Sequence, residues 1–161
     1  QQMGSHGPTY WQRVPDGFQK FQPICTSSQL DQCSPEQINN SYDNTIFYTD
    51  YFLAQTIEFL KVYDDRFETT LLYASDHGES LGENGLYLHG MPYSMAPVAQ
   101  THVPVMMWLG ARHSPIKKKL LLAHADKPIS HDNLFHSLLG LFGVETSAYL
   151  PQKDLLNSAL E

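Results

Sequence analysis

The segment from Pro35 to about Val62 has the strongest periodicity in the chain. The apolar residues that recur on one face at the 3.6-residue spacing of a helix are Ile46, Leu53, Ile57 and Leu60. The tetrapeptide SPEQ has the pattern of a helix start, with Ser34 as N-cap, Pro35 at the first helical position and Gln37 three residues after the cap. We therefore predict one long amphipathic helix, whose apolar stripe must be buried against a second layer of structure.

Two apolar runs are the candidates for that second layer. FETTLLYAS at 67–75 is continuous rather than alternating, which is typical of a strand buried on both faces of a parallel sheet. VPVMMWLG at 103–110 reads as another central strand. A further helix is predicted over Asp132–Phe142, with Ser130 as N-cap and Gly143 at its end. A helix, a buried strand and then a glycine-bearing loop form the α/β pattern.

Length and charge narrow the possible functions. The 161 residues suffice for one domain, and the formal net charge of −7 argues against a nucleic-acid surface. The basic run Lys117–Lys119 is typical of a solvated loop or helix face. The chain has neither an apolar run long enough to cross a bilayer nor a signal peptide, and it opens on QQMGSHGP without an initiator Met. We therefore expect a soluble internal fragment of a longer protein.

Two cysteines, Cys25 and Cys33, are separated by the polar stretch TSSQLDQ. They do not form the C-x-x-C pair of a zinc knuckle or a thioredoxin motif. Two cysteines that close a short polar loop predict a disulfide, and hence an oxidising compartment. The alternative is two unrelated free thiols.

The stretch SDHGESLGENGLYLHG at 75–90 follows the first predicted strand directly. Asp76 and His77 would lie at the carboxyl end of that strand, where open α/β sheets bind ligands. A carboxylate oxygen and an imidazole nitrogen at this point could bind the same zinc ion. His89 is too distant in sequence for a one-helix motif, so a shared site requires the loop to fold back, which Gly82 and Gly85 permit.

A third histidine, His6, lies in a similar glycine-rich context, GSHGP, within the irregular residues 1–41. Each histidine alone is more typical of a surface or structural residue. Together with Asp76, His77 and His89 it predicts a metal or phosphate site. Glu79, next to the Asp-His pair, is a candidate acid or base, or a residue supporting the site, although loop carboxylates are usually only solvated.

The motifs SDHGESLGENGLYLHG and GSHGPTYWQRVP together resemble the periplasmic catalytic domain of the lipid A phosphoethanolamine transferases. This family includes the mobile colistin-resistance enzymes and is part of the alkaline phosphatase and sulfatase superfamily. C-x7-C, YDNTIFYTDYFLAQTIEFL, VPVMMWLG and DNLFHSLLGLFGVET extend the likeness over nearly the whole chain. The resemblance implies a mixed sheet flanked by helices. Residues 1–161 would be the carboxyl-terminal part of one catalytic domain, whose upstream part and transmembrane helices lie outside the sequence.

The resemblance also implies a chemistry. In this family a Glu, a nucleophilic Thr and an Asp-His pair hold zinc, and the pair matches Asp76 and His77. Two further histidines bind a second zinc or the substrate phosphate, and they match His6 and His89. The threonine takes phosphoethanolamine from phosphatidylethanolamine and passes it to a lipid A phosphate, which gives resistance to polymyxin. The family acts at the periplasmic face of the bacterial inner membrane, and we expect a monomer.

Two departures accompany the resemblance. The Glu ligand and the nucleophilic Thr are expected upstream, and no threonine here matches their motif, including Thr45, Thr49, Thr69 and Thr70, so the fragment alone should be inactive. Gln1 stands where another histidine is expected. The alternative functions are a sulfatase or a phosphoglycerol transferase of the same superfamily, or a metal-binding module without catalysis.

Overall fold

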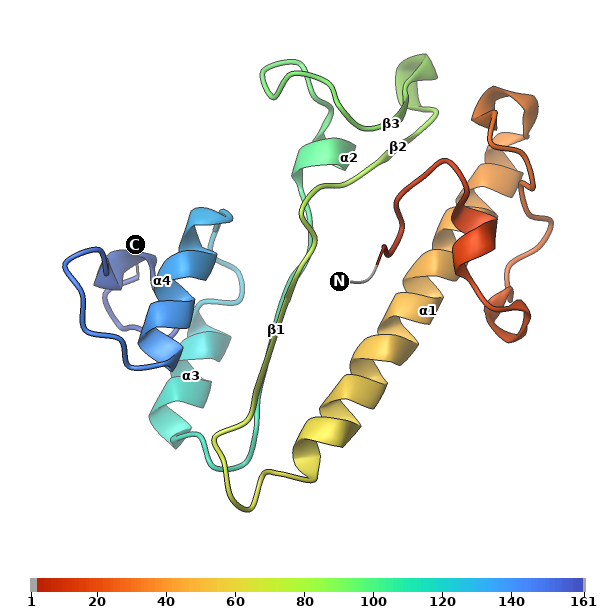
Figure 1. Cartoon of the computed structure of the whole chain (residues 1–161). Helices are drawn as coiled ribbons and strands as arrows, with labels where there is room; N and C mark the ends of the chain where they lie inside the picture. Colours follow the sequence, from red (N-terminus) through yellow and green to blue (C-terminus); the bar gives the residue numbers. More distant parts are fainter. Residues whose placement is uncertain (1–2, 161) are drawn as a thin grey trace. The chain divides into compact units, whose positions relative to one another are not determined.

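The computed structural model describes residues 3–160 (Figure 1). The chain divides into two compact units, and each is described by itself. The first unit holds the residues up to Phe59 together with Leu71–Trp108, and the second holds Leu60–Thr70 together with the residues from Leu109 onward. Within residues 3–160, every helix is either too short or too polar to cross a membrane.

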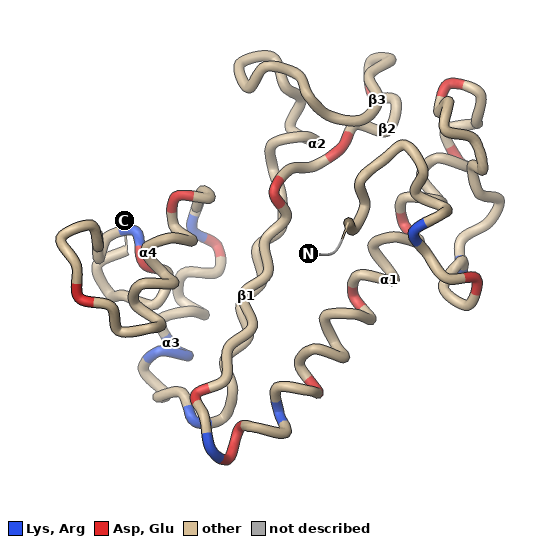
Figure 2. The backbone as a smooth tube through the Cα atoms, viewed as in Figure 1, with Lys and Arg blue, Asp and Glu red and all other residues tan. Residues whose placement is uncertain are grey.

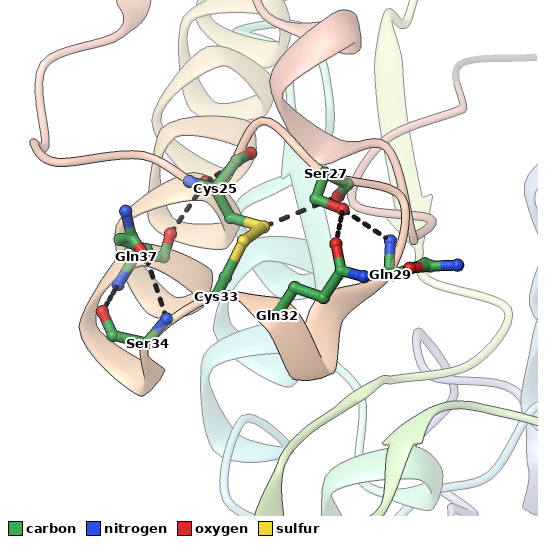
Figure 3. The surroundings of a disulfide bond; sticks show 8 residues. Cys25, Ser27, Gln29, Gln32, Cys33, Ser34 and Gln37 are labelled. Atoms are coloured by element: carbon green, nitrogen blue, oxygen red, sulfur yellow. Dashed lines mark hydrogen bonds between the residues drawn. A yellow bond between two sulfur atoms is a disulfide. The ribbon is translucent and has the colours of Figure 1, made fainter.

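The long predicted helix is confirmed as α1, Pro35–Lys61, with 27 residues. Its start is a reciprocal capping box, seen beside the disulfide in Figure 3. The Gln37 N–H donates to Ser34 Oγ at 3.2 Å, and the Ser34 N–H donates to Gln37 Oε1 at 2.9 Å. Because two otherwise unpaired N–H groups are satisfied this way, the helix begins where the local sequence predicts.

The N-terminal segment runs along the first half of α1 (Figure 1) and contains three short 3-10 helices, η1 (Tyr10–Arg13), η2 (Asp16–Phe18) and η3 (Leu30–Gln32). Asn44 of α1 bonds both to the Phe21 N–H at 2.8 Å and to the Phe21 carbonyl at 2.9 Å. The buried Asn44 side chain therefore satisfies both backbone groups of Phe21, which lies outside the strands.

The predicted disulfide between Cys25 and Cys33 is confirmed (Figure 3). Cys25 belongs to the buried apolar cluster of this unit, whose other members are Tyr10, Leu30 and Ile38. Leu81 and Leu88, from the predicted site loop, pack against the same cluster. The disulfide and the loop therefore share one small core.

The two predicted strands are β1, Thr70–Ala74, and β4, Val105–Leu109, and they are hydrogen-bonded neighbours. They run antiparallel, because the Ser75 N–H donates to the Pro104 carbonyl while the Gly110 N–H donates to the Thr69 carbonyl. Both strands are half-buried along their length. The expectation of a parallel strand buried on both faces is therefore wrong for this pair. A continuous apolar run predicts burial, but it does not tell the direction of the neighbouring strand.

Two short strands, β2 (Ser80–Leu81) and β3 (Tyr87–Leu88), form an antiparallel ribbon inside the loop between β1 and β4. The 3-10 helix η4, Glu83–Gly85, closes its end. Gly82 and Gly85 have φ values of +119° and +76°, which favour glycine. The predicted fold-back of the loop is confirmed, with the glycines at the positions that need them. The short helix α2, Val98–Thr101, follows the ribbon.

The second unit contains α3 (Pro115–Ala123), α4 (Asp132–Leu141) and η5 (Pro151–Lys153). Helix α4 confirms the predicted helix to within one residue, but its N-cap is His131 and not Ser130. Gly143 follows α4 with φ +62°, as predicted for a helix end. The sequence reading missed α3, which holds the lysine run on a helix that Ser114 caps by accepting from the Lys117 N–H at 3.2 Å.

Candidate metal centre

Three of the predicted site residues converge in the first unit. His6 comes from the N-terminal segment, His77 from the exit of β1, and His89 from the residue after β3. One ring nitrogen from each lies within 4.8 Å of the others, and His6 Nε2 is 3.1 Å from His89 Nε2. Nitrogens bound tetrahedrally to one zinc at 2.0–2.1 Å lie roughly 3.3 Å apart. The donor atoms therefore suit a transition-metal ion, and the His6–His89 pair has the spacing that one ion requires.

Backbone carbonyls fix the orientation of two of these rings. His6 Nδ1 lies 2.8 Å from the Gly7 carbonyl oxygen, and His77 Nδ1 lies 3.0 Å from the Gly78 carbonyl oxygen. A carbonyl oxygen only accepts, so in each neutral ring the proton is on Nδ1 and the lone pair is on Nε2. Both rings thus present Nε2 as the ligand atom, the arrangement that supports metal-binding histidines.

Asp76 lies outside the three-histidine cluster. Its side chain is exposed, and its Oδ1 accepts from the His77 N–H at 3.1 Å. It lines the same cavity as His6 and His77, a space of about 220 Å³. Its role as a metal ligand stays a prediction. Gln1, where a further histidine was expected, lies outside the described residues.

The cavity also exposes groups that the sequence did not single out, namely Tyr42, Tyr73 and His102. Burial, and next the negative charge of Glu79, raises the pKa of the Tyr42 phenol above its usual value. Burial, and next the charge of Asp76, does the same for Tyr73. Both phenols remain protonated at neutral pH and can donate hydrogen bonds. The sequence around these residues carries no signal of a site, because their place in the cavity depends on contacts between segments that are distant in sequence.

Glu79, predicted as an acid or base or as a residue supporting the site, is a buried carboxylate. Its side chain is only 6% exposed. Oε1 accepts from the Gly7 N–H at 2.9 Å, and Oε2 accepts from the Tyr10 hydroxyl at 2.5 Å. Burial, and then this hydrogen bond, raises the pKa of Tyr10 far above its usual value. The second loop carboxylate, Glu83, accepts from the Leu81 N–H at 2.7 Å and belongs to the turn.

The hydroxyls of Thr45, Thr69 and Thr70 have hydrogen-bond partners, and that of Thr45 bonds to the Ser5 hydroxyl at 2.6 Å, next to His6. The Thr45 hydroxyl donates to the Tyr42 carbonyl at 2.6 Å, and the Thr70 hydroxyl bonds to His113 Nε2 at 2.8 Å. Thr69 bonds to Asp64. That the nucleophile lies outside this chain stays a prediction.

The stretch that carries His77 and His89 has no basic side chain other than histidine. No lysine or arginine occurs from 67 to 111, and this stretch contributes only acidic groups and histidines. Figure 2 shows the β1 exit and the β2–β3 ribbon without a blue segment. An anionic ligand bound here would therefore meet no lysine or arginine from this stretch. A metal ion on the histidines would supply the missing positive charge.

The family of the chain follows from comparison with known proteins. Residues 1–144 match the family model described as Sulfatase. Phosphoethanolamine transferase EptA of Salmonella typhimurium is 48% identical over 158 residues, which are 96% of this chain and 29% of that protein. The chain thus spans less than a third of this curated relative.

Two solved structures share the fold. The C-terminal periplasmic domain of phosphoethanolamine transferase EptC from Campylobacter jejuni has a TM-score of 0.93 at 50% identity, over 98% of this chain and 50% of that one. The integral membrane protein lipooligosaccharide phosphoethanolamine transferase A from Neisseria meningitidis has a TM-score of 0.90 at 40% identity, over 95% of this chain and 29% of that one. The predicted sulfatase-like α/β fold, present as part of a domain, is confirmed. The chain belongs to the sulfatase family, and the resemblance of its motifs to the phosphoethanolamine transferases is borne out over nearly its whole length.

Proposed function

We propose that this chain is the carboxyl-terminal part of a zinc-dependent transferase that moves phosphoethanolamine from phosphatidylethanolamine to a phosphate of lipid A. The observation that carries the proposal is the convergence of His6, His77 and His89 at the exit of β1. The names of the relatives, which are phosphoethanolamine transferases, support the choice of the transferred group. The acceptor is supported by the lipooligosaccharide substrate named for the Neisseria protein.

The proposed roles follow the family resemblance, since the structure brings the three histidines together and leaves Asp76 outside their cluster. Asp76 and His77 contribute to one zinc site, and His6 and His89 bind either a second zinc or the substrate phosphate. His6 and His77 present Nε2 because their Nδ1 protons are held by carbonyl oxygens. Zinc, when bound, supplies positive charge that offsets the phosphate oxygens and lowers the pKa of a coordinated hydroxyl. Tyr73, kept protonated, can donate a hydrogen bond within the cavity.

The nucleophile in this proposal is a threonine outside residues 1–161, joined by a glutamate that completes the first zinc site. The threonine hydroxyl oxygen forms a bond to phosphorus while the bond from phosphorus to the diacylglycerol oxygen breaks. A lipid A phosphate oxygen then displaces the threonine and takes the phosphoethanolamine group. The chain by itself would therefore be inactive.

The proposed location is the periplasmic face of the bacterial inner membrane, with the protein acting as a monomer. The Cys25–Cys33 disulfide supports an oxidising compartment. The added amine would reduce the negative charge of lipid A and so give resistance to polymyxin. The alternative activities are sulfate-ester hydrolysis and phosphoglycerol transfer, which are consistent with the match to the sulfatase family model.

The test uses the intact natural protein with alanine at Asp76, His77 or His89. We expect loss of zinc for Asp76→Ala and His77→Ala, and loss of phosphoethanolamine transfer to lipid A for all three. The measurements are elemental analysis of the purified protein and mass spectrometry of lipid A. His131→Ala, an exposed histidine of the second unit, is the matched control. Full zinc content in the His77→Ala protein, or unmodified lipid A with the natural protein, would overturn the proposal.

A further inference from the structure

Glu79 joins the two segments that carry the histidines. Its two carboxylate oxygens accept from groups in the N-terminal segment, the Gly7 N–H at 2.9 Å and the Tyr10 hydroxyl at 2.5 Å. Gly7 directly follows His6, and Glu79 lies two residues after His77. The contacts cross 72 and 69 residues of sequence. The carboxylate therefore connects the immediate neighbours of two of the three histidines.

The third histidine, His89, is preceded by Leu88, whose side chain lies against Gly7. A side-chain carbon placed on Gly7 would meet Leu88 Cδ2, would lie 2.7 Å from the Tyr10 hydroxyl oxygen, and would lie 2.9 Å from Glu79 Oε2. Real contacts of this kind are not shorter than 3.0 Å. Leu88 directly precedes His89 and packs against the core cluster. Gly7 is thus wedged between the neighbour of His89 and the carboxylate that follows His77.

Both donors to Glu79 are neutral, and the carboxylate is 6% exposed. A buried carboxylate is costly unless hydrogen bonds replace its water, and its partners then become fixed in position. Removing it would leave the Gly7 N–H and the Tyr10 hydroxyl without this acceptor. The His6 segment would lose two of the contacts that hold it against the site loop, while the bond between the Thr45 and Ser5 hydroxyls would remain.

We infer that Glu79 is a positioning residue, which holds the His6 segment against the His77–His89 loop so that the three ring nitrogens meet. The inference rests on the proposed zinc site. It assigns Glu79 no contact with metal or substrate and no proton transfer. Its effect comes from two hydrogen bonds, and the negative charge is not itself required.

That last point makes the inference testable by a conservative substitution. In Glu79→Gln the amide oxygen can accept from the Gly7 N–H, while the amide N–H donates to the Tyr10 hydroxyl oxygen, because a hydroxyl can also accept. In Glu79→Ala both links are lost. A positioning residue predicts that glutamine rescues the site, whereas a metal ligand or a catalytic base would fail with either substitution.

The second unit offers a matched control. Asp154 is a carboxylate 3% exposed that also accepts from a tyrosine hydroxyl, Tyr149 at 2.7 Å, and from a backbone N–H, Leu156 at 2.8 Å. Asp154→Ala therefore removes the same kind of buried network from a unit without the histidine cluster. General loss of stability would appear in both alanine variants, and loss of metal only at Glu79.

The experiment titrates the intact natural protein and its variants with Zn²⁺ alone, after a circular dichroism check of folding. His6→Ala identifies which bound zinc depends on this segment. For that zinc we expect about 10- to 100-fold weaker binding in Glu79→Ala, as for other residues that support metal ligands, and near-natural binding in Glu79→Gln and Asp154→Ala. Natural affinity in folded Glu79→Ala, or equal loss in the glutamine variant, would overturn the inference.

A second readout does not need metal. Backbone hydrogen exchange of residues 3–10 should be faster in Glu79→Ala than in the natural protein and nearly unchanged in Glu79→Gln. Unchanged exchange in the alanine variant would overturn the inference even if no zinc binds. Conversely, if the natural protein binds zinc but transfers no phosphoethanolamine, the proposed function falls while the role of Glu79 stands.

Discussion

The glycine of the DHG motif makes a sharp prediction. A side-chain carbon on Gly78 would collide with the carbonyl oxygen of Ala99 and would lie 3.1 Å from the Ala99 carbonyl carbon and 3.4 Å from Gln100 Cα. All three are backbone atoms, so a side-chain rotation cannot relieve the collision. The φ of Gly78 is not positive, which means that close approach, and not a left-handed turn, requires glycine here.

The cost of Gly78→Ala can be worked out from these contacts. Overpacking costs about 1–3 kcal/mol, and displacement of the Gly78 loop from helix α2 would also break the bond from the Gly78 N–H to the Gln100 carbonyl, worth about 1 kcal/mol. The lower entropy of the unfolded alanine chain returns about 0.4–1 kcal/mol. We expect a net destabilisation of about 2 kcal/mol, together with displaced His77 and weaker zinc binding.

The assay is thermal or urea unfolding of the natural protein, Gly78→Ala and Gly17→Ala. Gly17 is the matched control, because a side-chain carbon there would meet nothing within 4 Å. Its alanine variant should be as stable as the natural protein or slightly more stable. Equal stability of the two alanine variants would show that close backbone approach does not require glycine at position 78.

Two further predictions concern the small core beneath the site. The Cys25–Cys33 disulfide closes a loop with a sequence separation of 8, so its reduction should lower the free energy of unfolding by roughly 2.5 kcal/mol through loop entropy. Mass spectrometry after alkylation checks that the bond is present. Equal unfolding midpoints with and without reductant would contradict this prediction. Tyr10 has a pKa raised above that of the unfolded chain by burial and then by Glu79, so its contribution to stability is complete below the ordinary tyrosine value of about 10 and is lost as the pH rises beyond it. Tyr10→Phe should flatten this alkaline loss, as measured by unfolding on either side of that pH, and an unchanged slope would refute the assignment.

Local signals predicted the parts of the fold that depend on neighbours in sequence. Ser34, Pro35 and Gln37 define the start of α1 because a capping box needs only four residues. Gly82 and Gly85 predicted the fold-back of the site loop, because glycine is the residue that adopts positive φ most readily. Helix α3 was missed although Ser114 and Pro115 carry the same start signal, since the lysines after them have no apolar period.

What depends on distant contacts could not be read in this way. The sequences of β1 and β4 do not reveal that the two strands pair in antiparallel, because parallel and antiparallel pairing bury the same side chains. The histidines were found by their glycine-rich surroundings, and their convergence needed the structure. The sequence does not separate a supporting role of Glu79 from an acid–base role, because its partners Gly7 and Tyr10 lie 72 and 69 residues away.

The separation of the histidines in sequence has a consequence for the order of folding. His6 and His89 are 83 residues apart, whereas α1 and the β2–β3 ribbon close over short distances. Contacts that close long loops cost more entropy than local contacts and therefore form later in folding. We expect the N-terminal segment to dock after the helix and the ribbon have formed. A metal ion held by His6 would then stabilise the docked segment only after the rest of this unit has formed.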